Sequence, residues 1–406
     1  MKFRKFTKPQ FLKSIGRELL GQLFTTFATD MASKGIAMPD AALPDDVYYK
    51  SLSNVAMAPD GLPDNMIDTL YAIEEMANVE GQERLENAVT QAGIGLTFAE
   101  QSSHGDIAVQ VFLASPALLV QTHNEVKLGR LAAFDYFGCP EPEDRSASFI
   151  PPTAEVLALL TADLDGWFKE HNRGKQTVHV EIKPMDGEFW FLVRHGDTFA
   201  RAPKVENGQM SVLHFRPAKD DVVVYSPKRD EIRIHAGIKG EKELYRQTFG
   251  ERLFGNPENF SDRKTYTLEP LRVDTIDSLD VSEIAGLDKI VLREFELNWK
   301  GGFNDSMTRK SDDVFAAAAK REKPAFPESG IIQRAALDFY FDGQKKPRRV
   351  QVRIPNTLKL GRHCDAALVH EWLSLRGFRA SESVTSPSPS PQSGEGTNHV
   401  EALAIA

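Results

Sequence analysis

Short runs of Val, Ile, Phe and other β-favouring residues recur about every ten residues in the middle of the chain. They lie at 177–182, 188–193, 210–215, 222–225 and 232–235, and turn-forming pairs such as Asp186-Gly187 and Asn207-Gly208 separate them. Strands this short and this evenly spaced predict an antiparallel β meander. The rest of the chain is organised around this segment.

Apolar residues at helical spacing predict helices on the N-terminal side of the meander. We expect helices at 10–32, from an N-cap at Asp64, and at 82–92, 106–113, 117–122 and 154–171, with a short strand pair at 126–137. The helix at 154–171 has the clearest apolar face, formed by Leu157, Leu160, Leu164 and Phe168. It is expected to cover one face of the meander, because an open sheet must bury its apolar side.

The pattern after the meander is mixed. It predicts a helix at 241–253, a strand at 290–299, a helix at 312–322 capped by Ser311, and a hairpin of 332–341 with 348–354. A last helix is expected at 363–376. From residue 381 onwards, Ser-Pro repeats and a Gly-containing stretch cannot build a core, and they predict a disordered tail.

These patterns predict an α+β protein. We expect a mostly helical N-terminal domain at 1–138, a linker at 139–152, a central domain at 153–300 with the meander covered by helices, a basic hairpin-plus-helix module at 301–380, and the tail at 381–406. A chain of 406 residues is long enough for several domains, each with its own core.

Composition narrows the class of protein. A hydrophobic content of 41% and a charged content of 26% are ordinary for a soluble globular chain. Cys139 and Cys364 lie far apart, which predicts neither a disulfide framework nor a zinc site and favours a reducing compartment. The longest apolar run, at 111–120, is too short to span a bilayer, and the N-terminus lacks a secretory signal. We therefore expect a cytoplasmic protein without a transmembrane segment.

Charge is strongly segmented along the chain. Residues 20–170 hold 7 basic and 23 acidic side chains, whereas residues 331–380 hold 10 basic and 4 acidic ones. The acidic segment at 20–170 and the basic segment at 331–380 can pair with each other or with a partner, and the basic segment can bind a polyanion.

Glu181 and Lys183 form a Glu-x-Lys tripeptide in the first expected strand, so both side chains face the same way. The tripeptide resembles the (D/E)-x-K half-motif of restriction-type nucleases. That resemblance implies Mg²⁺ held by Glu181 and a second acid, with Lys183 steadying the attacking water. Asp163 or Asp165 is close enough in sequence to be the second acid, although both lie on the expected helix. The alternative is that Glu-x-Lys is simply a half-exposed strand.

The segment Arg194-His195-Gly196-Asp197-Thr198 follows an apolar run. It resembles the first-strand motif of histidine phosphatases, in which the histidine accepts a phosphoryl group and the arginine clamps it. The resemblance implies a second catalytic histidine, and no convincing second segment of this kind occurs here. A strand that ends in a polar turn is the alternative reading.

Basic residues gather near the C-terminal hairpin. Lys345, Lys346, Arg348 and Arg349 lie in or beside its loop, and Arg353, Lys359 and Arg362 lead into the last helix. Such a cluster can contact the phosphates of DNA or RNA, or it can be a solvated surface that pairs with the acidic segment at 20–170.

Our leading expectation is a non-enzymatic binding or sensing component of a bacterial-type cytoplasmic multi-protein system, such as phage defence. It rests on the charge segmentation and the lack of a complete catalytic motif in the sequence. The expected partners are another protein or a second copy, and DNA or RNA at the basic cluster. No cofactor or metal is expected except Mg²⁺ under the nuclease alternative.

Overall fold

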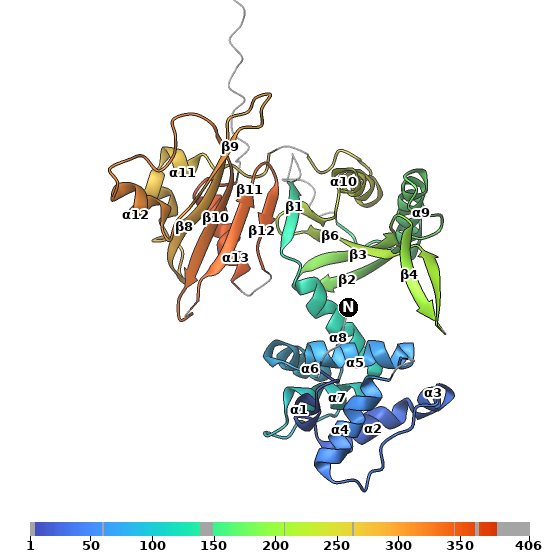
Figure 1. The fold of residues 1–406 in the computed structure, drawn as a ribbon. Coiled ribbons are helices and arrows are strands. Elements are labelled where there is room, and N and C mark those ends of the chain that lie inside the picture. The colour runs from blue at the N-terminus through green and yellow to red at the C-terminus, as the bar shows by residue number, and fades with distance from the viewer. Residues whose placement is uncertain are drawn as a thin grey trace, which may run out of the picture. The chain divides into compact units, whose positions relative to one another are not determined.

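The computed structural model of the chain describes residues 5–58, 61–138, 149–206, 208–261, 264–344, 346–361 and 365–379. Backbone contacts divide the chain into two compact units, Met1–Ala133 with Leu360–His363, and Phe134–Lys359 with Cys364–Ala406. Within the described residues, helices combined with a large antiparallel sheet confirm the predicted α+β class (Figure 1). The predicted tail at 381–406, both cysteines and most of the predicted linker lie outside the described residues.

The first unit is helical, as predicted. Its helices are α1 (Pro9–Lys13), α2 (Arg17–Thr26), α3 (Ala28–Ser33), α4 (Asp45–Ala56), α5 (Asp64–Met76), α6 (Val79–Gln91), α7 (His104–Ala114) and α8 (Pro116–Gly129). Their apolar faces meet in one core that includes Leu20, Phe24 and Ile73, all fully buried. Ser103 begins α7 with a capping box, in which Ser103 and Asp106 satisfy each other's backbone N–H groups.

Several predicted boundaries in this unit are wrong. The single helix expected at 10–32 is three helices, with breaks at 14–16 and at Phe27. At the first break, Gly16 is the N-cap of α2 and donates its N–H to Asp106 Oδ1 at 2.6 Å. Asp64 is the first residue of α5 rather than its N-cap, which is Pro63. The strand pair expected at 126–137 is also absent, since α8 continues to Gly129 and only β1 (Ala133–Gly138) is a strand.

The second unit is built on a ten-stranded sheet. Its other strands are β2 (His179–Met185), β3 (Glu188–Gly196), β6 (Ala218–Ser226), β7 (Glu231–His235), β8 (Leu287–Asn298), β9 (Ser306–Lys310), β10 (Ile331–Phe341), β11 (Arg348–Arg353) and β12 (Thr357–Lys359). Their order is β2-β3-β6-β7-β1-β12-β11-β10-β8-β9. Strands from both expected modules, 153–300 and 301–380, share this sheet, because β8 pairs with β10.

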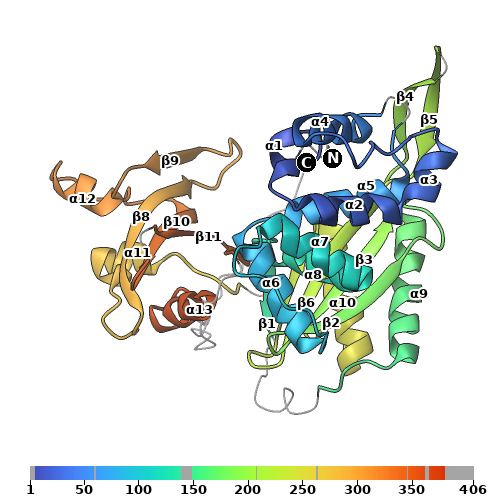
Figure 2. The same ribbon diagram turned by 90° about the horizontal axis from the view of Figure 1, so that it is seen from below.

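One predicted meander strand belongs elsewhere. Residues 210–215 lie in β5 (Gln209–Phe215), which pairs only with β4 (Ala200–Glu206) in a separate hairpin. The reason is the register of the main sheet, where Gly196 at the end of β3 already pairs with Ala218 at the start of β6. The chain between them is therefore an excursion, and the hairpin extends away from the sheet (Figure 2).

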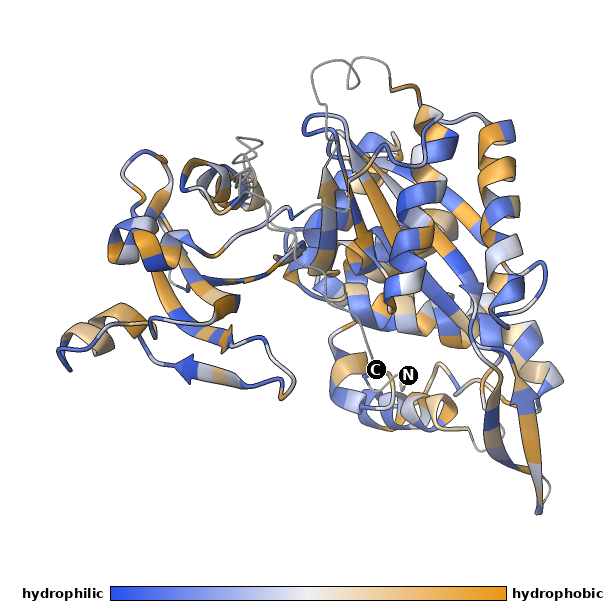
Figure 3. Ribbon diagram, turned by 90° about the horizontal axis from the view of Figure 1, so that it is seen from above, coloured by the Kyte–Doolittle hydropathy of each residue, from blue (hydrophilic) through white to orange (hydrophobic). Residues whose placement is uncertain are grey.

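Two helices, α9 (Ala154–Glu170) and α10 (Lys239–Phe254), pack on one face of the first half of the sheet. Leu160, Leu164 and Phe168 of α9 are fully buried in a core with Phe191 and Val193 of β3, which confirms the expected cover. Burying one such side chain contributes about 2 kcal/mol. Apolar and polar residues alternate along β7, whereas β3 and β6 carry continuous apolar runs at 189–193 and 222–225. Figure 3 colours these elements by hydropathy.

The second half of the sheet buries its other side. Trp372 of α13 (Ala366–Leu375) lies 5.2 Å from the ring of Phe339 on β10, and Phe295 on β8 packs against Phe326 beside α12 (Val314–Ala319). The short helices α11 (Pro270–Val273) and η3 (Thr275–Leu279) complete this part. The predicted cap Ser311 is wrong, because Asp313 accepts the N–H of Ala316 and caps α12.

Candidate functional site

A polar face lies opposite α13 on the strands β9, β8, β10, β11 and β12. Strand register places the following charged side chains on it, and we call them the basic face: Lys289, Arg293, Glu294, Glu296, Lys310, Arg334, Asp338, Arg349, Arg353 and Lys359. Seven of these are cations and three are carboxylates, so the face is positive. The side chains of Arg349 and Arg353 are 52% and 55% exposed, which shows that solvent reaches it.

Two of the three carboxylates of the basic face, Asp338 and Glu296, each lie against two arginines. Asp338 accepts from Arg293 Nε at 2.6 Å and from Arg349 Nε at 2.8 Å. Burial alone would raise the pKa of Asp338, but the hydrogen bonds from Arg349 and Arg293 outweigh it and hold that pKa below its usual value. Because the single negative charge of Asp338 lies between Arg293 and Arg349, these three side chains together keep a net positive charge.

The predicted basic cluster is divided by the alternation of strand side chains. Arg349, Arg353 and Lys359 lie on the basic face, and Lys346 is exposed in the turn that leads to it. Arg348 points to the opposite face, where its Nε lies 3.3 Å from the buried Asp365 carboxylate. Two further predicted residues, Lys345 and Arg362, lie outside the described residues.

The structure does not bring Asp165, Glu181 and Lys183 into one site. Glu181 Oε1 and Lys183 Nζ are 3.5 Å apart on one face of β2, as expected from the Glu-x-Lys spacing. Asp165 belongs to α9, which packs against the other face, among Val180 and Ile182. Its carboxylate accepts the backbone N–H groups of residues 176, 177 and 178 at 2.8, 2.8 and 3.4 Å, so it holds the turn between α9 and β2.

Arg194 and His195 also point in opposite directions. Arg194 forms a two-pronged pair with Asp220 on the exposed side of β3, with Nε–Oδ1 at 2.7 Å and Nη2–Oδ2 at 3.0 Å. His195 is fully buried on the other side, and its ring stacks on Phe168 with centroids 3.9 Å apart. The two side chains therefore cannot act together on one phosphoryl group.

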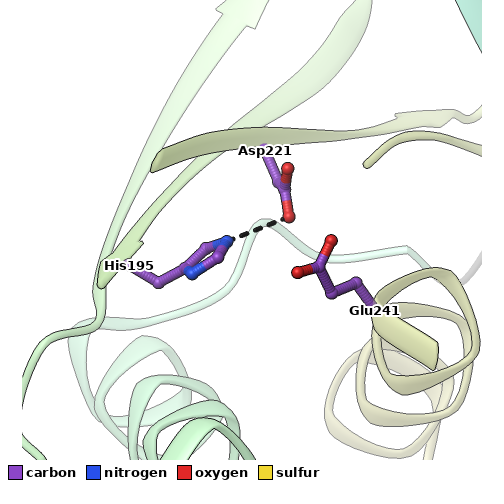
Figure 4. A group of neighbouring side chains, drawn as sticks. All are labelled: His195, Asp221 and Glu241. Carbon is purple, nitrogen blue, oxygen red and sulfur yellow. Dashed lines mark hydrogen bonds and ion pairs between the residues drawn. The ribbon is translucent and has the colours of Figure 1, made fainter. Parts of the chain in front are cut away.

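His195 belongs to a buried polar cluster that the sequence did not reveal. His195 on β3, Asp221 on β6 and Glu241 in the first turn of α10 each offer a ligand atom, and these atoms all lie within 4.8 Å of one another. Figure 4 shows the imidazole and the Glu241 carboxylate both turned toward Asp221. Asp221 Oδ2 lies 3.1 Å from His195 Nε2 and accepts the Tyr245 hydroxyl at 2.9 Å.

Lysine and arginine side chains balance part of the negative charge in this cluster. Lys219 Nζ lies 2.6 Å from Glu241 Oε2 and 3.4 Å from Asp221 Oδ1. Burial would raise the pKa of Asp221, but the hydrogen bond from His195 and the Lys219 charge lower it. Glu241 Oε1 makes no hydrogen bond within the described residues, and Arg173 Nη2 lies 3.9 Å from it.

No sequence pattern pointed to this cluster. Asp220-Asp221 resembles a polar turn, whereas the structure places both residues inside β6 and turns Asp221 inward. Glu241 follows twenty residues later on a helix, so only the fold joins the two carboxylates. Within the described residues, this is the one group of three or more His, Cys, Asp or Glu side chains spaced closely enough to hold a metal ion.

Comparisons with known proteins identify no family for this chain. Within the described part of the chain, no helix has both the length and the apolar character needed to cross a bilayer. No known protein-family model matches the sequence, and no curated protein is significantly similar to it.

Proposed function

We propose that this protein is a nucleic-acid-binding component that holds the phosphate backbone of DNA or RNA on its basic face. One observation supports this most strongly. Arg349, Arg353 and Lys359 extend from the neighbouring strands β11 and β12 on the same face, and all three side chains are exposed. Arginine and lysine groups in such an array release the counterions of a polyanion, which is the main source of nonspecific affinity for nucleic acids.

The spacing of the cations suits several phosphates at once. Arg349 and Arg353 are four residues apart on β11, which corresponds to roughly 13 Å along a strand. Lys359 lies on the adjacent strand, paired with Gln351 between the two arginines. Contacts of this kind position a nucleic acid without reading its bases, so the proposed binding is not sequence-specific.

The wider role predicted from the sequence stays a prediction. It is a non-enzymatic binding or sensing component of a bacterial-type cytoplasmic system, such as phage defence, with a further protein partner. The hairpin β4–β5 is the surface that best suits such a partner, because Val205, Met210 and Val212 are 68%, 82% and 38% exposed there.

Binding of labelled DNA and RNA across a salt series tests the proposal. We expect the affinity to fall steeply with salt, and the Arg349→Gln/Arg353→Gln double variant to reduce the slope of log K against log salt by about 2. The matched control is Lys169→Gln/Lys175→Gln, which removes two exposed cations from a different part of the chain. Equal binding by both double variants, or no binding at low salt, would contradict the proposal.

A further inference from the structure

The two ring nitrogens of the buried His195 have different hydrogen-bond partners. His195 Nδ1 lies 2.9 Å from the carbonyl oxygen of Gly196, which can only accept, so Nδ1 donates its hydrogen there. Nε2 then faces carboxylates, with Asp221 Oδ2 at 3.1 Å. A metal-ligating histidine usually donates its second ring N–H to a backbone carbonyl or a carboxylate, as Nδ1 does here, so Nε2 is the nitrogen that can bind an ion once it gives up the hydrogen that it donates to Asp221.

Glu241 supplies an independent observation. Its side chain is fully buried, and its Oε1 atom makes no hydrogen bond within the described residues. A buried carboxylate oxygen without a hydrogen bond costs free energy unless a cation satisfies it, and Arg173 Nη2, at 3.9 Å, is too far from Oε1 to donate a hydrogen bond. One carboxylate oxygen of Glu241 lies within 4.8 Å of the His195 and Asp221 ligand atoms, so one ion can contact all three groups.

From these contacts we propose that His195, Asp221 and Glu241 bind one divalent first-row transition-metal ion. Nitrogen and oxygen ligands about 2.1 Å from one ion lie roughly 3 to 4 Å from one another, so a small movement of the Glu241 side chain closes the site. The imidazole ligand favours Zn²⁺ over Mg²⁺ or Ca²⁺, which prefer oxygen, and the two carboxylates suit Mn²⁺ as well. This site is separate from the basic face and does not depend on the proposed nucleic-acid binding.

Lys219 is the internal competitor of the metal. Its ammonium group lies 2.6 Å from Glu241 Oε2 and 3.4 Å from Asp221 Oδ1, and so occupies part of the space between the carboxylates. Its side chain is 27% exposed, which gives it a path to solvent when an ion enters. The divalent ion therefore takes the place of the singly charged Lys219 ammonium group between the two carboxylates.

Metal titration of the full-length protein tests the proposal. After treatment with a chelator, the protein is titrated with Mn²⁺ followed by electron paramagnetic resonance, and with Zn²⁺ followed by dialysis and elemental analysis. We expect one equivalent to bind, an affinity loss of at least about tenfold in Glu241→Gln, and a gain of about tenfold in Lys219→Met. Glu251→Gln, an exposed change on the same helix, is the matched control and should bind as the wild type does.

Several results would overturn the proposal. The proposal is wrong if neither the wild type nor Lys219→Met binds stoichiometric metal. It is also wrong if Glu241→Gln binds the metal as the wild type does while circular dichroism shows that the variant is folded. If Glu241→Gln does not fold, the comparison of wild type with Lys219→Met still decides. In that comparison, equal or weaker binding by Lys219→Met contradicts the competition between the lysine and the ion.

Discussion

Arg379 Nη2 donates a hydrogen bond to Glu231 Oε2 at 2.5 Å, across 148 residues of sequence. Glu231 is on β7 and only 1% exposed, whereas Arg379 follows α13, so the pair joins the two halves of the sheet unit. Arg229 also pairs with Glu231. Burial would raise the pKa of Glu231, but the charges of Arg379 and Arg229 lower it to about 2.

Removing Arg379 should therefore weaken the second unit considerably. The Arg379→Met variant leaves the buried Glu231 with Arg229 as its remaining close partner, and we expect a loss of about 3 kcal/mol in the free energy of unfolding. Urea unfolding measures this loss. Arg252→Met is the control, because Arg252 and its partner Asp163 are about one-third exposed and such a pair contributes at most about 1 kcal/mol. Equal losses in the two variants would contradict the role of Arg379.

His370 should make the stability depend on pH. It is buried near Arg229, Glu231, Arg379 and Arg233, and burial, followed by the charge of Arg229, lowers its pKa to about 3. Between pH 6.5 and pH 3 the unfolded chain therefore binds a proton at this histidine that the folded protein does not. The free energy of unfolding should fall as pH falls through this range, by at most about 1.4 kcal/mol per pH unit.

The His370→Leu variant separates this effect from other titrations. It should flatten the pH dependence of urea unfolding between pH 6.5 and pH 4.5, above the range in which Glu231 loses its stabilising charge. The exposed His171, changed to Gln, is the control and should leave the slope as it is. An unchanged slope in His370→Leu would show that another group dominates.

Two helical glycines should respond oppositely to alanine. A Cβ on Gly81 would lie 2.1 Å from the carbonyl oxygen of Met76, which is backbone and cannot move away cheaply. Gly81→Ala should therefore destabilise the first unit by about 2 kcal/mol or more. A Cβ on Gly21 in α2 meets nothing within 4 Å, and Gly21→Ala should stabilise by up to about 1 kcal/mol. Thermal unfolding of both variants checks the opposite signs.

The periodicity of the sequence predicted the elements better than their assembly. The apolar face of Leu160, Leu164 and Phe168 is a local pattern, so α9 and its packing could be predicted. The place of residues 210–215 could not, because the pairing of Gly196 with Ala218 is a property of the whole sheet. The pattern along a strand indicates that it is a strand, but does not identify its neighbours.

The candidate sites were predictable only in part. The excess of basic residues near the C-terminus is visible in the composition, but the separation of Arg348 from Arg349 onto opposite faces depends on the strand register. The sequence places His195 beside Arg194, yet its side chain bonds to Asp221 and lies near Glu241. Those residues come from separate elements, and only tertiary packing brings them together.

Asp165 should prove to be a structural residue. Its carboxylate accepts three backbone N–H groups at the start of β2, so Asp165→Ala leaves donors without partners. We expect a loss of about 2 kcal/mol in the free energy of unfolding, with less than about 0.5 kcal/mol for Glu181→Ala, whose side chain is 48% exposed. Loss of an Mg²⁺-dependent nuclease activity in both variants, with stability unchanged, would instead support the nuclease alternative.

Removing a carboxylate from the basic face should strengthen polyanion binding. Glu296 accepts from Arg334 Nε at 2.9 Å and lies 3.9 Å from Arg353 Nη2, so it attenuates two cations. Glu296→Gln keeps an oxygen for Arg334 but removes the negative charge. A unit charge about 4 Å from a phosphate in water is worth about 1 kcal/mol, which corresponds to roughly a fivefold gain in affinity at low salt.

A control variant and the salt dependence of that gain in affinity distinguish an effect of the basic face from an effect of the net charge of the protein. Glu251→Gln changes the net charge of the chain by the same amount but lies on α10, so it should leave the affinity almost unchanged. Raising the salt concentration should shrink the gain in Glu296→Gln, because ions screen the added attraction. A similar gain in both variants would mean that the phosphates respond to net charge alone, and that the strands β8, β10 and β11 do not form the binding surface.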